Sequence, residues 1–308
     1  MMRILIAGGT GFVGSHLVQH FLKKSESVTV LGRSTKKIAD QFPDKITPLE
    51  WNKLTLEDIS SFDLIINLAG TNIGEGRWSK KRKASILQSR IEATEILSNF
   101  CKQLGEESPA LFNASAIGVY GLQETSNALP KAMDETLTID FNTSSDFLSK
   151  VGRAWELATK PATDAGARVV NMRFGVVIDW SGGVLKKMAA PFYFGMGGKV
   201  GSGNQAFSWI ALSDLIRAID FLIEHQEIKG PVNFVSPECI QQKVLAKAIA
   251  KALHRPCFFT APAFMLKLAF GEMAEELLLK GQHVYPKRLL DAGFVFERVS
   301  VDKGLVSI

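Results

Sequence analysis

The feature that most constrains the fold is a glycine-rich stretch close to the first residue. An apolar run, Arg3–Ala7, leads into Gly8-Gly9-Thr10-Gly11-Phe12-Val13-Gly14, and a helical pattern over Gly14–Lys24 follows. Glycines at this spacing allow a tight turn, let the backbone approach a pyrophosphate and let the helix pack closely on the strand. The free N–H groups at the helix N-terminus then face the phosphates. The order of strand, turn and helix predicts a dinucleotide-binding unit; the alternative is a glycine-rich turn that holds no ligand.

Short apolar runs alternate with longer helical patterns through the first two-thirds of the chain. The expected strands are Arg3–Ala7, Val28–Leu31, Ile46–Leu49, Leu64–Leu68, Leu111–Ala114 and Val169–Met172. The expected helices between them are Gly14–Lys24, Lys80–Leu104 and Phe147–Ala165. Continuously apolar strands that alternate with helices are typical of a parallel sheet covered on both faces. We therefore predict an α/β fold with a doubly wound parallel Rossmann sheet.

The end of the second expected strand favours one nucleotide over another. NAD-binding folds usually place an Asp or Glu there, and its carboxylate binds the ribose 2′-hydroxyl. This chain instead has Gly32-Arg33-Ser34, with Lys36 and Lys37 close behind. Because a guanidinium pairs bidentately with phosphate, Arg33 is expected on a 2′-phosphate. We predict NADP(H) in preference to NAD(H); the alternative is an Arg33 that stacks on adenine or is solvated.

The pattern changes after Gly175. Residues 181–204 are rich in glycine, which predicts loops near a ligand. Beyond them the chain predicts a helix over Ser213–Glu224, a strand over Val232–Val235 and helices over 241–254 and 263–280. We predict an NADP-binding Rossmann domain over residues 1–175, to which residues 208–236 return. Residues 176–308 then form a smaller C-terminal substrate lobe that includes a helical module.

Composition excludes several classes of protein. Hydrophobic residues make up 46% and charged residues 22% of the 308, as in globular proteins rather than disordered or collagen-like chains. No run of about 20 apolar residues and no signal-peptide pattern occurs, so we expect a cytoplasmic protein without a membrane partner. The net charge of +5, part of it in the run Arg77–Lys83, favours an anionic small molecule. No nucleic-acid-binding motif accompanies that run, so we expect no nucleic acid partner.

Further stretches carry a family resemblance. These are Asn67-Leu68-Ala69-Gly70, Ser115–Gly121, Ser208–Leu215, Ile73–Thr94, Gly201–Trp209 and Gly281–Phe294. With the GxxGxxG turn, the chain resembles the extended short-chain dehydrogenase/reductases, and among them the sugar-nucleotide-epimerase-like "epimerase family" branch with its small C-terminal module. The resemblance covers essentially the whole chain. It implies a Rossmann lobe, NADP(H), a substrate lobe of the nucleotide-sugar type and an assembly compatible with a homodimer.

The predicted cofactor-binding residues follow from the glycine-rich turn, from Arg33 and from the family resemblance. They are Gly8, Thr10, Gly11, Phe12, Val13, Gly14, Arg33, Asn67, Leu68, Ala69, Gly70 and Ser115. Asn67 follows a strand at the edge where parallel sheets bind ligands. Its alternative role is to bind local backbone and shape the loop.

The chain departs from that superfamily at the catalytic positions. The resemblance implies a Tyr-x-x-x-Lys pair plus a Ser or Thr, in which Tyr is the acid/base and Lys lowers its pKa. No Tyr-x-x-x-Lys occurs here: alignment on Glu156 puts Leu148 and Gly152 at these positions. The Ser position falls on Ala116. The polar candidates for catalysis are Ser115, Tyr120 and Lys150. Their alternatives are a hydroxyl bound to loop backbone, a packed Tyr and a solvated helix face.

Seven residues are predicted to contact the substrate: Arg77, Trp78, Arg90, Arg173, Gln205, Ser208 and Trp209. Arg77 beside Trp78 on a glycine-rich loop suits an anionic substrate with a planar ring. The alternative is a surface loop with Trp78 packed inward. Arg90 and Arg173 are expected to face the cleft, either to bind phosphate or to form structural ion pairs. The resemblance places the last three on the floor of the substrate lobe.

Two functions follow from these observations. The first is an NADP(H)-dependent oxidoreductase or epimerase that acts on a small polar, nucleotide-sugar-like substrate through a degenerate Tyr-x-x-x-Lys site. The missing Tyr and Lys motivate the alternative, a non-catalytic NADP(H)-binding redox sensor or regulatory protein. His16 and His20 share a helix face but lack a third ligand, and the three cysteines form no CxxC, so we expect no metal.

Overall fold

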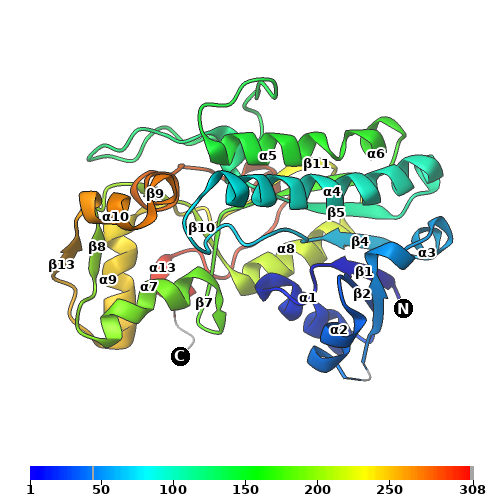
Figure 1. Ribbon diagram of the computed structural model, residues 1–308, viewed down its shortest axis with the longest axis horizontal. Coiled ribbons are helices and arrows are strands. Elements are labelled where there is room, and N and C mark those ends of the chain that lie inside the picture. Colours follow the sequence, from blue (N-terminus) through cyan, green and yellow to red (C-terminus); the bar gives the residue numbers. More distant parts are fainter. Residues whose placement is uncertain (44, 306–308) are drawn as a thin grey trace.

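The computed structural model describes residues 1–43 and 45–305, and a seven-stranded sheet forms its centre. The strands are β1 (Arg3–Ala7), β2 (Ser27–Gly32), β3 (Thr47–Glu50), β4 (Leu64–Asn67), β5 (Ala110–Ala116), β6 (Val169–Phe174) and β11 (Gly230–Phe234). Their order is β3-β2-β1-β4-β5-β6-β11, and every neighbouring pair is parallel (Figure 1). This is the order of a dinucleotide-binding sheet, which confirms the predicted doubly wound Rossmann fold.

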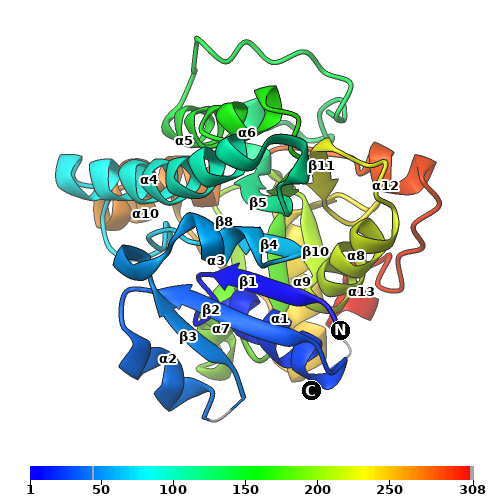
Figure 2. The same cartoon turned by 90° about the vertical axis from the view of Figure 1, so that its right-hand side faces the viewer.

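Each face of the sheet is covered by helices. Ile4 and Ile6 of β1 pack toward α1 (Phe12–Lys23) and α8 (Leu212–Glu224). Leu5 and Ala7 pack on the opposite face, in a core shared with α4 (Lys80–Leu104) and α6 (Lys160–Asp164). Figure 2 shows α4, α5 (Phe147–Leu157) and α6 on one side of the sheet and α1 on the other. Both faces are therefore covered by helices, which explains why β1 is apolar on both sides. Two short helices, α2 (Thr35–Gln41) and α3 (Leu56–Ser60), complete this half.

A smaller lobe is built from later parts of the chain. Its helices are α7 (Gly183–Tyr193), α9 (Gln242–Leu253), α10 (Ala263–Phe270), α11 (Glu272–Ala274) and α13 (Val301–Gly304), whereas α12 (Lys287–Asp291) packs through Leu289 in the core of the large sheet. Its strands are β7 (Val176–Asp179), β8 (Gly198–Val200), β9 (Ala206–Phe207), β10 (Trp209–Ala211), β12 (Ile240–Gln241) and β13 (Phe259–Ala261). Phe192, Trp209 and Leu245 are buried in its core. Among the described residues no helix is both long and apolar enough to cross a bilayer.

Three predicted segments differ from the structure. The helix expected over Phe147–Ala165 is split into α5 and α6, because Pro161 has no N–H to continue the ladder. The helix expected over 263–280 breaks at Gly271, whose φ of +62° ends α10. The loops expected over 181–204 are wrong for Gly183–Tyr193, which form α7.

The turn between β1 and α1 requires glycine at two positions. Gly8 has φ +77°, and a Cβ there would lie 2.8 Å from the Leu68 carbonyl. A Cβ on Gly14 would lie 2.4 Å from the Gly8 oxygen. Without side chains at these positions, α1 begins directly against the carboxyl ends of β1 and β4.

We expect Gly14→Ala to lower the free energy of unfolding by about 1–3 kcal/mol, because the new methyl group has no room. Gly11→Ala is the matched control: its φ is −76°, and its Cβ would contact only the Gly8 oxygen, at 3.3 Å. Its loss should stay within about 0.5 kcal/mol. Urea denaturation followed by circular dichroism measures both variants. Equal losses would show that the contact with Gly8 is not what requires glycine.

Candidate functional site

The start of α1 is open to a ligand. Its N-cap is Gly11, and no side chain caps the first turn. The N–H groups of that turn therefore need another acceptor, which a phosphate or water supplies. Thr10 and Gly11 are exposed, and Phe12 and Val13 are half-buried. The turn offers backbone N–H donors without intrahelical partners, and its glycines have no Cβ atoms to keep a pyrophosphate away. These residues therefore fit a dinucleotide.

The second lobe touches this turn directly. Cβ atoms on Gly182 and Gly183 would lie within 2.7–3.0 Å of the Phe12 ring. His16 lies one turn further along α1, and its Nε2 is 3.1 Å from Ser181 Oγ. Glycine in this part of the chain thus permits close contact between the lobes at the edge of the predicted cofactor site.

Arg33 is exposed at the carboxyl end of β2. It precedes α2, whose N-cap Ser34 accepts a hydrogen bond from the Lys37 backbone N–H. Gly32 occupies the last position of β2, and a Cβ there would lie 2.9 Å from Ile38 Cδ1. The segment that follows β2 thus carries a cation where NAD-binding folds have a carboxylate, which suits a 2′-phosphate. The carboxylate beside it, Glu50 at the end of β3, accepts hydrogen bonds from the Thr35 backbone N–H at 3.1 Å and hydroxyl at 3.3 Å.

The loop after β4 is shaped by Asn67. This buried side chain donates to Thr94 Oγ1 at 3.0 Å and to Asn113 Oδ1 at 2.7 Å. Its own Oδ1 accepts from the Ala69 backbone N–H at 3.2 Å. All of its polar atoms are thus used inside the protein, as in the loop-shaping alternative. The half-buried Leu68 and Ala69 and the exposed Gly70 form the edge of the sheet that faces the turn.

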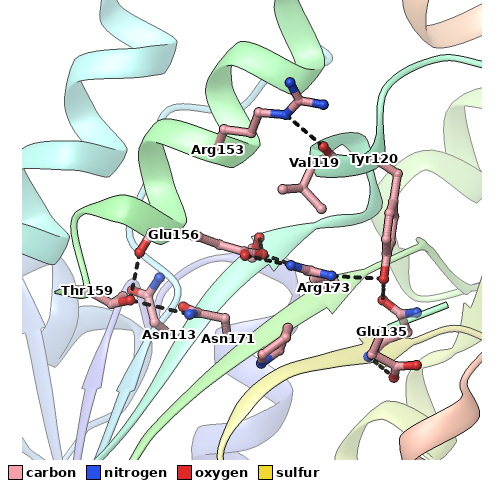
Figure 3. A network of polar contacts seen from close by, with 12 residues as sticks. Asn113, Val119, Tyr120, Glu135, Arg153, Glu156, Thr159, Asn171 and Arg173 are labelled. Carbon is pink, nitrogen blue, oxygen red and sulfur yellow. Dashed lines mark hydrogen bonds and ion pairs between the residues drawn. The ribbon is translucent and has the colours of Figure 1, made fainter. Parts of the chain in front are cut away.

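A buried polar network lies between β5, α5 and β6 (Figure 3). Arg173 donates from Nε and Nη2 to the two carboxylate oxygens of Glu156, both at 2.8 Å. Ser115 Oγ donates to Glu156 Oε1 at 2.7 Å. Arg173 Nη1 also donates to Tyr120 Oη at 2.8 Å, and Tyr120 donates to Asn233 Oδ1 at 3.0 Å. The network joins two of the three predicted catalytic residues to a predicted substrate residue.

The electrostatics of this network hold Tyr120 in its protonated form. Burial raises the pKa of Tyr120 to about 12, although Arg173 and Asn233 act in the opposite direction. Burial alone would lower the pKa of Arg173, but the hydrogen bonds and charge of Glu156 raise it above the ordinary value. Arg173 is therefore a permanent buried cation whose charge Glu156 neutralises. A phenol with so high a pKa is a poor general base near neutral pH.

The positions that correspond to the missing Tyr and Lys are filled by packing. A Cβ on Gly152 would lie 2.9 Å from the Val119 backbone nitrogen. Leu148 packs over Gly118, whose Cβ would lie 3.2 Å from Leu148 Cβ. Lys150 is exposed on α5 and outside the buried network. Helix α5 thus lies against the turn Ile117–Tyr120 in the space that a longer side chain at position 152 would need.

The loop over residues 71–79 is held by arginine and tryptophan side chains. Trp78 is buried, and its indole donates to the Ile73 carbonyl at 3.0 Å, as in the packed alternative. Arg90 donates to the Thr71 carbonyl at 2.9 Å and lies 4.9 Å from the Trp155 ring centroid; burial lowers its pKa to about 10. Arg77 is exposed, and its guanidinium, which a Cβ on Gly271 would meet at 3.2 Å, forms no ion pair or hydrogen bond with the part of the chain that the structure describes. Of the predicted arginines, Arg77 has its charge available.

Gln205, Ser208 and Trp209 lie inside the second lobe. Gln205 donates to the carbonyls of Val200 and Leu278, at 3.1 and 2.6 Å. Ser208 donates to the Gln282 carbonyl at 2.9 Å. Trp209 is fully buried in the lobe's core. Gln205 and Ser208 join residues 278–282 to the second lobe. Trp209 belongs to a different core cluster from the helix that follows the Gly8–Gly14 turn.

Sequence reasoning missed two members of the buried network. Glu156 served only to align the helix, yet it is the acceptor for both Ser115 and Arg173. No pattern in the sequence marked it; its burial at 6% exposure in the structure is what shows that the carboxylate requires a partner. Asn233 carried no signal, because it follows Tyr120 by more than a hundred residues and meets it only through the pairing of β11 with β6.

We expect Glu156→Gln to lower the free energy of unfolding by about 3–5 kcal/mol, because Arg173 then stays buried without a countercharge. Ser115→Ala removes one hydrogen bond to a carboxylate and should cost about 1.5–3 kcal/mol. The double variant Glu156→Gln/Arg173→Met should recover most of the loss, since no charge remains unpaired. Chemical denaturation measures all three variants. A double variant less stable than Glu156→Gln would contradict the assigned pair.

Comparison with known proteins agrees with this geometry. Residues 4–235 match the NAD dependent epimerase/dehydratase family, and residues 261–308 match a domain of unknown function, DUF1731. An epimerase family protein of Staphylococcus haemolyticus is 37% identical over 298 residues, which cover 96% of this chain and 95% of that protein. One of Mycobacterium bovis is 36% identical over 306 residues, or 98% and 96% of the two chains.

A solved structure is similar over nearly the full length. The human epimerase family protein, crystallised with NADPH, has a TM-score of 0.83 and 28% identity, and the match covers 99% of this chain and 98% of that one. A nucleoside-diphosphate sugar epimerase from Corynebacterium glutamicum has a TM-score of 0.74 and 26% identity, and the match covers 99% of this chain and 57% of that one. With matching sheet, glycine turn and C-terminal module, this chain belongs to the NAD dependent epimerase/dehydratase family and to its epimerase family proteins that carry DUF1731.

Proposed function

We propose that the protein binds NADP(H) and uses it as an oxidoreductase or epimerase on a small polar substrate of the nucleotide-sugar type. The observation that carries the proposal is the open, glycine-lined start of α1 beside the exposed Arg33 at the end of β2. Backbone donors there suit the pyrophosphate, and the guanidinium suits a 2′-phosphate. The NADPH in the structure of the human relative supports the same choice of nucleotide.

Substrate recognition is proposed for the loop over residues 71–79. Arg77 is its available cation, and Lys187 of α7 donates to the Gly74 carbonyl at 3.1 Å, so the loop connects the two lobes. A phosphate group of a nucleotide sugar would compensate the charge of Arg77. The sugar epimerase among the similar structures supports this substrate class. We also propose a cytoplasmic location and a homodimer, as the sequence led us to expect.

The chemistry proposed for the chain differs from that of a Tyr-Lys enzyme. Bound NADP(H) supplies hydride transfer at its nicotinamide. Tyr120 and Ser115 are fixed by Arg173, Asn233 and Glu156, so we assign them to positioning the end of β5 and the turn after it. The proton that accompanies hydride transfer must then pass to water or to a group of the substrate.

A second function has a specific observation in its favour. The Gly152 position is closed by the Val119 backbone, so the site is built without room for the usual Lys. A protein that binds NADP(H) and signals its redox state needs the cofactor residues and none of the acid/base residues. Under this alternative the cofactor changes the affinity for a partner, and no substrate is reduced.

We expect Arg33→Asp to weaken NADPH binding by about tenfold to a hundredfold, because the variant loses a charge-assisted pair and gains repulsion. NADH has no 2′-phosphate, so its affinity should change little. Lys102→Asp is the control, because that exposed lysine lies in the last turn of α4, away from the end of β2. Calorimetric titration with both nucleotides measures the effect. An equal change for NADPH and NADH would remove Arg33 from the 2′-phosphate site.

NADPH deuterated at C4 of the nicotinamide separates the two functions. The protein is incubated with this cofactor and a metabolite extract that contains nucleotide sugars, and products are searched for deuterium by mass spectrometry. The oxidoreductase proposal predicts a labelled product in the wild type and less label with Arg77→Ala. An epimerase returns the hydride to the sugar from which it was taken, so it is detected in a parallel incubation with NADP⁺ as a changed ratio of two epimeric nucleotide sugars after chromatographic separation. Bound cofactor with neither label transfer nor epimer interconversion would favour the sensor, and absence of bound cofactor would contradict both.

A further inference from the structure

One end of the second lobe exposes a group of large apolar side chains. They come from the end of α7, the segment before β8, the start of β13 and α10, and we call them the apolar face: Tyr193, Phe194, Met196, Phe258, Phe259, Phe264, Met265 and Leu268. Phe194, Phe258, Phe264 and Leu268 are each at least 70% exposed. Strands β8 and β13 pair in parallel, which brings these segments together. In Figure 1 they form the end of the molecule opposite the N-terminal strands.

Helix α10 shows that this exposure is not incidental. Its sequence is Ala-Phe-Met-Leu-Lys-Leu-Ala-Phe, and none of its residues is buried. A surface helix normally turns an apolar stripe inward and a polar face outward, whereas a helix that is apolar all round belongs in an apolar environment. Exposed apolar groups of this size mark interaction sites. The helix therefore needs an apolar environment that residues 1–43 and 45–305 do not supply.

The segments that build the apolar face carry charge of one sign, and the acidic Glu272 and Glu275 that follow α10 are paired with Lys83 and Lys267. Residues 180–213 and 239–271, which build α7, β8, α9, β13 and α10, contain no Asp or Glu. Their cationic side chains are Lys186, Lys187, Lys199, Lys243, Lys247, Lys251, Arg255 and Lys267. Lys251 and Lys267 pair with Asp302 and Glu275 from outside these segments. The remaining cations have no acidic partner among the described residues, so the face is complementary to an anionic surface.

We propose that the apolar face docks on a membrane surface rich in anionic phospholipid. Aromatic and Met side chains would enter the headgroup region, while Lys199 and Arg255 would reach phosphates, as long cationic side chains do at interfaces. Two copies of the face placed together would instead oppose cation to cation. Because no helix of the described residues is long and apolar enough to span the bilayer, the protein would lie on its surface. The proposal departs from the expectation that no membrane is involved, and it is independent of the proposed function.

Vesicle co-sedimentation tests the proposal with the full chain. The probes are vesicles of phosphatidylcholine alone and vesicles of phosphatidylcholine with phosphatidylglycerol. Wild type should sediment with the anionic vesicles only. Phe264→Ser/Leu268→Ser should lower the partition coefficient by at least about tenfold, because two large apolar groups no longer leave water. Lys199→Glu and Arg255→Glu should each lower it by about fivefold or more.

Matched variants separate docking from general effects. Val295 is 70% exposed outside the face, so Val295→Ser should leave the partition within about twofold. Lys53→Glu is the control for a change of charge outside the apolar face, and it should leave the partition within about twofold. Unchanged thermal unfolding of every variant shows that the fold is intact. Absence of sedimentation, or equal sedimentation of Phe264→Ser/Leu268→Ser, overturns the proposal. A lipid-free dimer that this variant abolishes overturns it too and assigns the face to a second copy.

Discussion

The ion pair between Arg173 and Glu156 is the interaction on which the middle of this protein depends. Burying two charges is costly, and the cost is offset only when both find several partners. Here Glu156 accepts three hydrogen bonds and Arg173 donates three, so β6, α5, the end of β5 and the turn at Tyr120 must occupy one arrangement. The Tyr120 hydroxyl then reaches Asn233 and connects the edge strand β11. One buried ion pair thereby fixes how α5 lies on this face of the sheet.

That arrangement divides the site into two unequal halves. The nucleotide half keeps everything that binding requires: glycine at Gly8 and Gly14, an uncapped helix start and a cation at Arg33. The chemical half is packed shut, with Leu148 and Gly152 against the turn after β5. Close packing of α5 and a catalytic Lys exclude one another at this position. The geometry thus favours cofactor binding. Any hydride transfer would need a proton acceptor or donor other than the usual Tyr.

The second lobe has a different physical character. Its inner side is an ordinary apolar core around Trp209, while its outer end combines exposed aromatic side chains with unpaired cations. The lobes meet where Gly182 and Gly183 contact Phe12. The glycine turn proposed to bind the nucleotide and the apolar face proposed to dock on a membrane are separate parts of the molecule.

The sequence by itself determined the parts that depend on local rules. Strand and helix order, the glycine turn and the absence of Tyr-x-x-x-Lys could be predicted, because each rests on spacing along the chain. Breaks at Pro161 and Gly271 were missed, since helical periodicity continues across them. Only the tertiary structure decided that Arg173 meets Glu156 and Tyr120 rather than a ligand, and that Arg77 stays available. Such pairings join residues far apart in sequence. A charged side chain must be paired only when it is buried, and burial is decided by the tertiary structure.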